Sequence, residues 1–294
     1  CKNMNSIKHS IKNLTDKLPT FSSLFSVSGD AKTTKGLKYG YITAIQYLAP
    51  SRVSGIVNLC KWASDGCINA CLNTAGRASF DTQISKARIN RTIWFVRDKM
   101  QYWARFTREI DALIRKGIRD GLTPVVRPNG TSDQPYERMK IKGTRFDGMT
   151  IFEAYPEIQF YDYTKAPFSE RPIIPDNYHL TYSYNENTTP EMIAENINNG
   201  RNVAVVFNVC KLDNRKKCHN KCTCPFPATW NGFKVISGDE NDIRFKDPIG
   251  VIVALHAKGK ARFDTSGFVI NLSDPRKWKL GINYTYKNIQ FIAS

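Results

Sequence analysis

The sequence predicts an α/β fold in which parallel strands form a full or partial (β/α) barrel with a cysteine-rich insertion. Three observations support this. Strand-like and helix-like segments alternate along most of the chain. The segment NVAVVFNV at 202–209 is continuously apolar, as expected for a parallel strand buried on both faces. Polar residues follow the apolar strands at their carboxyl ends, where a barrel of this kind presents its active site.

The individual elements follow from periodicity and from their boundary residues. Apolar residues between 82 and 117 recur mostly at steps of three and four, which predicts helix. A helix over Pro190–Gly200 has proline at its start and glycine at its end. Strands are predicted at 40–48, 122–130, 157–165, 178–186, 202–209, 232–238 and 250–257, with a short helix over 147–155.

This alternation implies right-handed βαβ units and therefore a parallel sheet. A doubly wound open sheet is the alternative architecture, but no G-x-G-x-x-G motif follows any predicted strand. We expect a polar N-terminal extension over 1–35, a barrel-like domain over 36–272 that includes the insertion at 210–226, and a C-terminal tail over 273–294.

The charge balance favours a polyanionic partner. The chain carries 43 Lys and Arg residues against 26 Asp and Glu residues, a net charge of +17. Nucleic acid is the first candidate and a nucleotide or an acidic surface the second, while a basic protein without such a partner is the alternative. No apolar run approaches the length of about 18 residues that a transmembrane helix requires, so no membrane association is expected. Residues 1–14 lack the apolar core of a secretory signal.

The first cysteine group lies directly after the first predicted strand. Cys60, Cys67 and Cys71 have the spacing C-x6-C-x3-C, and no fourth cysteine is nearby. Three thiolates suit an iron–sulfur cluster with one open iron, or a zinc ion completed by another ligand or by water. Unliganded thiols are the third alternative.

The second cysteine group lies in the insertion and contains Cys210, Cys218, Cys222 and Cys224, with His219 among them. Four thiolates fill a tetrahedral site, so a closed, structural zinc site is expected. A second iron–sulfur cluster is the alternative. Without a secretion signal, metal is favoured over disulfides for both groups.

Polar residues at the strand ends form the candidate pocket. Asp162 and Lys165 are candidate catalytic residues, because they provide a carboxyl group and an ammonium group for proton transfer. The candidate cofactor-binding residues are Arg127, Asn129, Thr181, Ser183 and Lys258. Solvated or salt-bridged strand ends are the alternative for each. No Ser–His–Asp arrangement, P-loop or H-E-x-x-H motif is evident.

Many separate motifs resemble a phage-encoded family of unknown function called gene product eighty-eight. They are KTTKG, YLAPS at 47–51, the cysteine loop ending in CLNTAGR, RPNGTSD at 127–133, QFYDYTK at 159–165, HLTYS at 179–183, NVAVVF, PATWNGFKVISGDENDIRF at 227–245 and AKGKARFDTSGFV at 257–269. The resemblance covers roughly residues 30–272. It implies the cytoplasm of a phage-infected bacterium, or the virion, as the location, and it supplies no reaction.

The layout also resembles radical-SAM proteins, in which three cysteines after the first barrel strand hold three irons of a four-iron cluster. The usual spacing there is C-x3-C-x2-C, and here it is C-x6-C-x3-C. The Gly-Gly-Glu stretch that commonly binds the cofactor's methionine part is not evident after the second strand, where RPNGTSD stands instead. An iron–sulfur cluster is therefore better supported than SAM.

Two functional readings follow. The first is an iron–sulfur protein with a radical-SAM-like barrel that acts as an enzyme on a nucleotide or nucleic acid. The alternative is a non-enzymatic, basic, zinc-stabilised protein that binds nucleic acid or is associated with the virion. The metal present separates the two, and the sequence identifies no protein partner.

Overall fold

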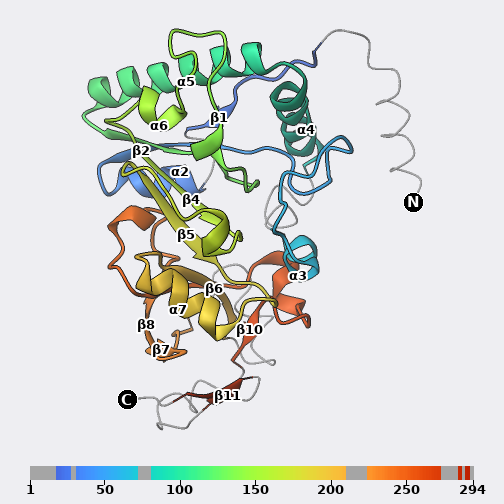
Figure 1. The fold of residues 1–294 in the computed structure, drawn as a ribbon, viewed down its shortest axis with the longest axis vertical. Coiled ribbons are helices and arrows are strands. Elements are labelled where there is room, and N and C mark those ends of the chain that lie inside the picture. The colour runs from blue at the N-terminus through green and yellow to red at the C-terminus, as the bar shows by residue number, and fades with distance from the viewer. Residues whose placement is uncertain are drawn as a thin grey trace.

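A computed structural model describes residues 18–27, 31–71, 81–209, 224–272, 284–286 and 289–291 of the chain. Within these residues, ten strands form one sheet in the order β1-β2-β3-β4-β5-β6-β9-β8-β7, and β10 pairs with β6 beside β5. All neighbours from β2 to β8 are parallel, whereas β1 and β7 are antiparallel strands at the two ends. Figure 1 shows this sheet running from the top of the molecule to the bottom.

The strands are β1 (Phe25–Ser26), β2 (Tyr41–Gln46), β3 (Thr123–Arg127), β4 (Gln159–Thr164), β5 (Tyr178–Ser183), β6 (Val203–Asn208), β7 (Thr229–Trp230), β8 (Phe233–Ser237), β9 (Ile252–His256) and β10 (Ile270–Asn271). A separate antiparallel pair consists of β11 (Tyr284–Tyr286) and β12 (Ile289–Phe291).

The helices are α2 (Ala31–Leu37), α3 (Asp65–Asn69), α4 (Thr82–Arg97), α5 (Lys99–Asp120), α6 (Ile151–Ala154) and α7 (Pro190–Asn198), with short 3₁₀ turns at Tyr136–Arg138, Phe168–Glu170, Arg244–Lys246 and Gly259–Phe263. Helices α3 to α7 each begin after a residue whose side chain accepts a hydrogen bond from a free backbone N–H of the first turn. The periodic stretch 82–117 forms two helices because Asp98 leaves helical geometry, with φ −137°, and its carboxylate accepts from the Gln101 N–H. None of the described helices is both long and apolar enough to cross a bilayer.

Two apolar clusters lie between the sheet and these helices. One packs α4, α5 and α6 against the β1–β5 half, with Tyr102, Phe106 and Phe160 fully buried. The other packs α7 against β5, β6, β9 and β10. In Figure 1, α5 and α6 lie at the top of the molecule and α7 near the bottom.

The opposite face of the sheet is covered by α2 and by the segment between β8 and β9. Gly36 of α2 lies close to Thr43 on this face. The Phe245 ring in the β8–β9 segment packs edge-on against Tyr41, with ring centroids 5.3 Å apart, and 5.6 Å from Tyr161. This connection therefore crosses the face from β8 to β2.

The predicted mixed α/β fold with a largely parallel sheet is confirmed. Strands β2, β3, β4, β5 and β6 are adjacent in the order in which they occur in the chain, as in a barrel or in part of one. No pairing among the described residues joins the β1 end of the sheet to the β7 end. Barrel closure therefore remains a prediction. Because the strands are parallel, the carboxyl ends of β2–β6 and β9 lie at one edge, called here the carboxyl edge.

Candidate functional site at the carboxyl edge of the sheet

The first cysteine loop leaves the carboxyl edge directly after β2. The chain turns at Pro50 and Ser51, where Ser51 has φ 47°, and reaches Cys60 before entering α3. Cys60 Sγ accepts a hydrogen bond from the Ser51 N–H at 3.2 Å. The loop therefore folds back on its own start.

Helix α3 is anchored by a carboxylate from far along the chain. Glu186 lies just after β5, and its two oxygens accept from the Ser64 hydroxyl and the Gly66 N–H, each at 2.7 Å. The Ser64 oxygen in turn accepts from the Cys67 N–H at 3.2 Å. Glu186 thus positions the backbone that carries Cys67.

We expect Glu186→Ala to free α3 and to accelerate alkylation of Cys67 several-fold in the metal-free protein, because Gly66 and Ser64 lose their shared acceptor. Gly66→Ala is expected to act in the same direction, since a Cβ there would lie 2.7 Å from both Glu186 oxygens. Glu186→Gln keeps one acceptor and a polar partner for Ser64, so it serves as the matched control. Mass spectrometry of timed iodoacetamide reactions measures the rate at each cysteine. Equal rates in wild type and Glu186→Ala would show that the carboxylate does not hold the loop.

The three thiols are close enough for their charges to interact. Burial raises the pKa of Cys60 to about 12, with smaller contributions from Asp133, Cys71 and Cys67. Burial also raises the pKa of Cys67, and Lys165 opposes that shift. Among the described residues, no three His, Cys, Asp or Glu side chains converge closely enough to hold an ion. The thiols are neighbours without forming a ready ligand set.

Lys165, a predicted catalytic residue, lies beside these thiols. Its Nζ donates to the Ser183 carbonyl at 3.2 Å, the Ser183 Oγ at 2.9 Å and the Tyr184 carbonyl at 3.0 Å. Burial lowers the pKa of Lys165, while Cys67, Asp133 and Glu186 oppose this. The structure therefore brings Lys165 and the predicted Ser183 together, with a cation next to Cys67.

Asp162, the other predicted catalytic residue, is fully buried in a polar network. Its oxygens accept from the Asn129 N–H at 2.8 Å, the Asn129 Nδ2 at 3.0 Å and the Tyr178 hydroxyl at 2.9 Å. The Asn129 amide also donates to the Gln134 carbonyl at 3.0 Å. Asp162 and Asn129 thus shape the loop after β3.

Arg127 and Thr181 face the side of the sheet that the β8–β9 segment covers. The Arg127 guanidinium donates to Asp242 at 2.7 Å, and its side chain is only 4% exposed. The buried Thr181 hydroxyl has no hydrogen-bond partner within the described part of the chain. Lys258 lies elsewhere on the carboxyl edge and pairs with Asp239 at 2.7 Å. These three residues do not join the cysteine group.

A family model described as Gene product 88 matches residues 23–272. The chain belongs to the Gene product 88 family. This phage-associated family has no known function, and its model confirms the resemblance inferred from the motifs. No significant match was found among curated proteins or among solved structures. The comparisons show no radical-SAM resemblance.

The Gene product 88 match spans both cysteine groups and every predicted strand-end residue. Of the second group, Cys210, Cys218 and Cys222 lie outside the described residues. Cys224 is described, and its carbonyl lies 3.0 Å from the Nε2 of His256.

Sequence reasoning missed Asp133 and Glu186, the two carboxylates near the thiols. Asp133 accepts from the Thr164 hydroxyl at 2.9 Å and the Lys165 N–H at 2.7 Å. A signal was present, because Asp133 ends RPNGTSD and Glu186 follows β5. Both are polar residues that follow a parallel strand, but they lie further along the loop after that strand than the residues that were selected.

Proposed function

We propose that this Gene product 88 protein is an iron–sulfur protein whose cluster is held by Cys60, Cys67 and Cys71. The observation that carries the proposal is the position of the three neighbouring thiols, on the loop after the first parallel strand of a consecutively ordered sheet. Ligands of parallel α/β sheets bind at this edge. A radical-SAM-like use of the cluster is the finer form of the same proposal.

The three thiols are not gathered around one point among the described residues, but their sulfur atoms are the donor type that a soft metal takes. Cys60 and Cys67 are buried enough for their thiolates to be unfavourable without a positive partner. Thiolates prefer zinc, copper(I) and iron–sulfur clusters over hard cations. The N–H of Ser51 already points at Cys60 Sγ, and such hydrogen bonds tune the potential of cluster sulfurs.

The surrounding residues have separate tasks. When bound, a cluster with three thiolate ligands supplies electron transfer and one open iron position. Lys165 places a positive charge beside Cys67, and Glu186 fixes the backbone of α3. Asp133 accepts a hydrogen bond from the Lys165 backbone N–H and lies near Cys60 and Cys67. SAM is one candidate for the open position, and the departures from the radical-SAM motifs count against it.

The proposal predicts that wild-type protein purified without oxygen is brown and contains iron and acid-labile sulfide. Cys67→Ala is expected to lose both together with the colour, because two thiolates do not retain the cluster. Cys1→Ala is the matched control, since Cys1 belongs to neither cysteine group, and it should retain full iron. Metal analysis and visible absorption are the measurements.

Two outcomes would contradict the proposal. Iron retained in the Cys60, Cys67 and Cys71 triple alanine variant would place the cluster in the second group. A colourless wild type that contains zinc would favour the zinc-stabilised, non-enzymatic reading. Circular dichroism of each variant separates loss of metal from loss of fold.

A further inference from the structure

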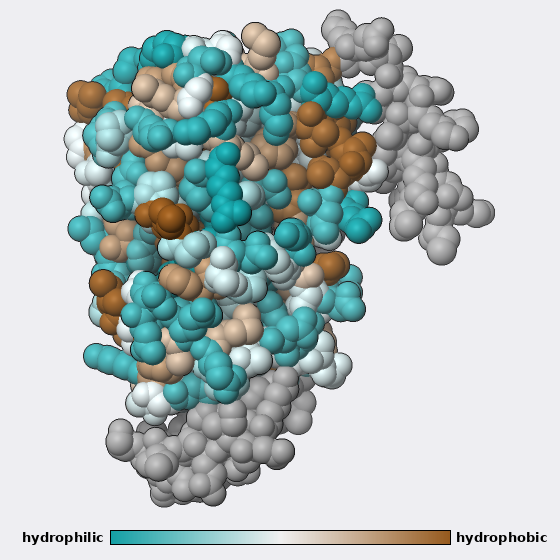
Figure 2. All heavy atoms as spheres, in the orientation of Figure 1, coloured by the Kyte–Doolittle hydropathy of each residue, from teal (hydrophilic) through white to brown (hydrophobic). Residues whose placement is uncertain are grey.

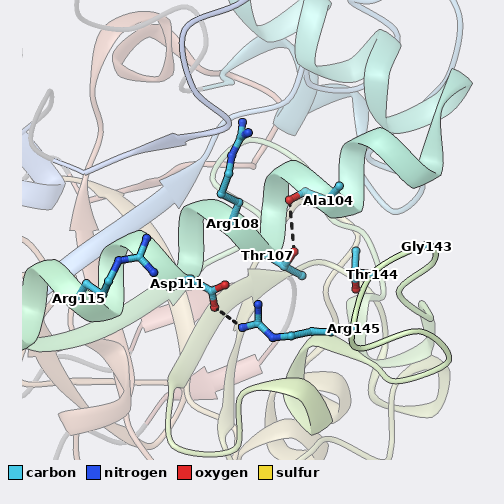
Figure 3. A pocket seen from close by; sticks show the side chains of 8 residues that line it. All are labelled: Ala104, Thr107, Arg108, Asp111, Arg115, Gly143, Thr144 and Arg145. Atoms are coloured by element: carbon cyan, nitrogen blue, oxygen red, sulfur yellow. Dashed lines mark hydrogen bonds and ion pairs between the residues drawn. The ribbon is translucent and has the colours of Figure 1, made fainter.

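An arginine-lined hollow lies on the exposed side of α5, apart from the cysteine loop. Its volume is about 290 Å³, and it is formed by one stripe of α5 and the turn at 143–145. The lining residues are Ala104, Thr107, Arg108, Asp111, Arg115, Gly143, Thr144 and Arg145 (Figure 3). On α5 these positions recur at steps of three and four, so they share one helix face.

The hollow has an excess of positive charge. Arg145 pairs with Asp111 at 2.8 Å, and Asp111 also accepts from the Tyr155 hydroxyl at 3.0 Å. Figure 3 shows the Arg145 and Arg115 guanidinium groups on either side of the Asp111 carboxylate. Within the described residues, neither Arg108 nor Arg115 has an ion pair or hydrogen bond. The lining residues therefore carry three guanidinium groups against one carboxylate, with the Arg108 guanidinium pointing away from Asp111 in Figure 3.

The positive stripe spans two turns of α5. From Arg108 to Arg115 the helix extends about 10 Å, at 1.5 Å per residue. Lys99 at the start of α5 is not part of this stripe, because its Nζ lies 3.4 Å from the ring centroid of the buried Phe95 in α4. Adjacent phosphates of a nucleic-acid strand fit within the length from Arg108 to Arg115.

We propose that the Arg108–Arg115–Arg145 hollow binds phosphate groups of a nucleic-acid backbone. Guanidinium groups form bidentate hydrogen bonds to phosphate, and backbone contacts of this kind do not depend on sequence. The net charge of +17 steers polyanions to the protein, and the hollow gives them a defined place. The face seen in Figure 2 is covered mainly by hydrophilic side chains. This inference is independent of the iron–sulfur proposal.

The test compares two triple variants with the same loss of charge. The first variant changes Arg108, Arg115 and Arg145 to Gln. The second changes three exposed lysines that do not line the hollow, Lys38, Lys234 and Lys246, to Gln. Fluorescence anisotropy with a labelled DNA duplex and a labelled single strand gives the affinity at several salt concentrations. We expect the arginine variant to lose roughly tenfold or more in affinity, and its salt slope to fall by roughly two to three. The lysine variant should change little.

A gain-of-binding variant guards against misfolding as an explanation. Asp111→Asn removes the one carboxylate of the hollow and keeps an oxygen for Arg145 and Tyr155, so it should bind DNA more tightly. Equal losses in both triple variants would overturn the inference, because they would reveal a general charge effect. It would also be overturned if the wild type failed to bind at low salt, or bound anionic phosphatidylserine vesicles but neither nucleic acid.

Discussion

Replacing Arg171 with methionine is expected to lower the free energy of unfolding by about 3–5 kcal/mol. The Arg171 guanidinium donates two parallel hydrogen bonds to Glu137, both 2.7 Å, and both side chains are 4% exposed. A third donor reaches Asp133 at 3.2 Å, and a fourth reaches the Tyr178 hydroxyl at 3.2 Å. Removing this guanidinium would leave Glu137 and Asp133 largely buried without the cation that pairs with both of them.

A double-mutant cycle tests the origin of this loss. Glu137→Leu added to Arg171→Met is expected to recover part of the stability, because the buried carboxylate is removed with its partner. Arg145→Met breaks an ion pair on the surface and should leave the unfolding transition nearly unchanged. Urea denaturation followed by circular dichroism provides the free energies. A loss below about 1 kcal/mol for Arg171→Met would mean that the pair contributes no more than a surface pair.

Asp162→Asn is expected to cost about 2–4 kcal/mol, although the two side chains have nearly the same shape. Asn129 and Tyr178 present only donors to Asp162. An asparagine there has one acceptor oxygen, so its own N–H groups would face donors. Each buried donor that loses its partner costs about 1–3 kcal/mol. Asn129→Asp in the same background would provide a partner for the new amide and should restore part of the stability.

Local patterns determined the order and type of the elements. Helical periodicity identified α4 and α5, because the side chains on one helix face recur every three or four residues. The continuous apolar run identified β6, because a parallel strand inside the sheet is buried on both faces. The parallel sheet followed from the alternation of these elements. Periodicity did not reveal the break at Asp98, since the apolar stripe continues through it while a single cap interrupts the backbone.

The tertiary structure decided which polar residues meet. Arg127 and Asp242 are 115 positions apart, and Gly66 and Glu186 are 120 apart. No local sequence pattern therefore indicates that either pair forms a contact. Asp162, a predicted catalytic residue, lies in a buried network, whereas Asp133 and Glu186 lie near the thiols. The sequence by itself determined that three thiols follow the first strand at the carboxyl edge. Only the packing of loops from distant strands decided which charges surround them. The position of a strand end predicts the edge of the sheet at which a residue lies, but it does not predict which residues from other loops contact it.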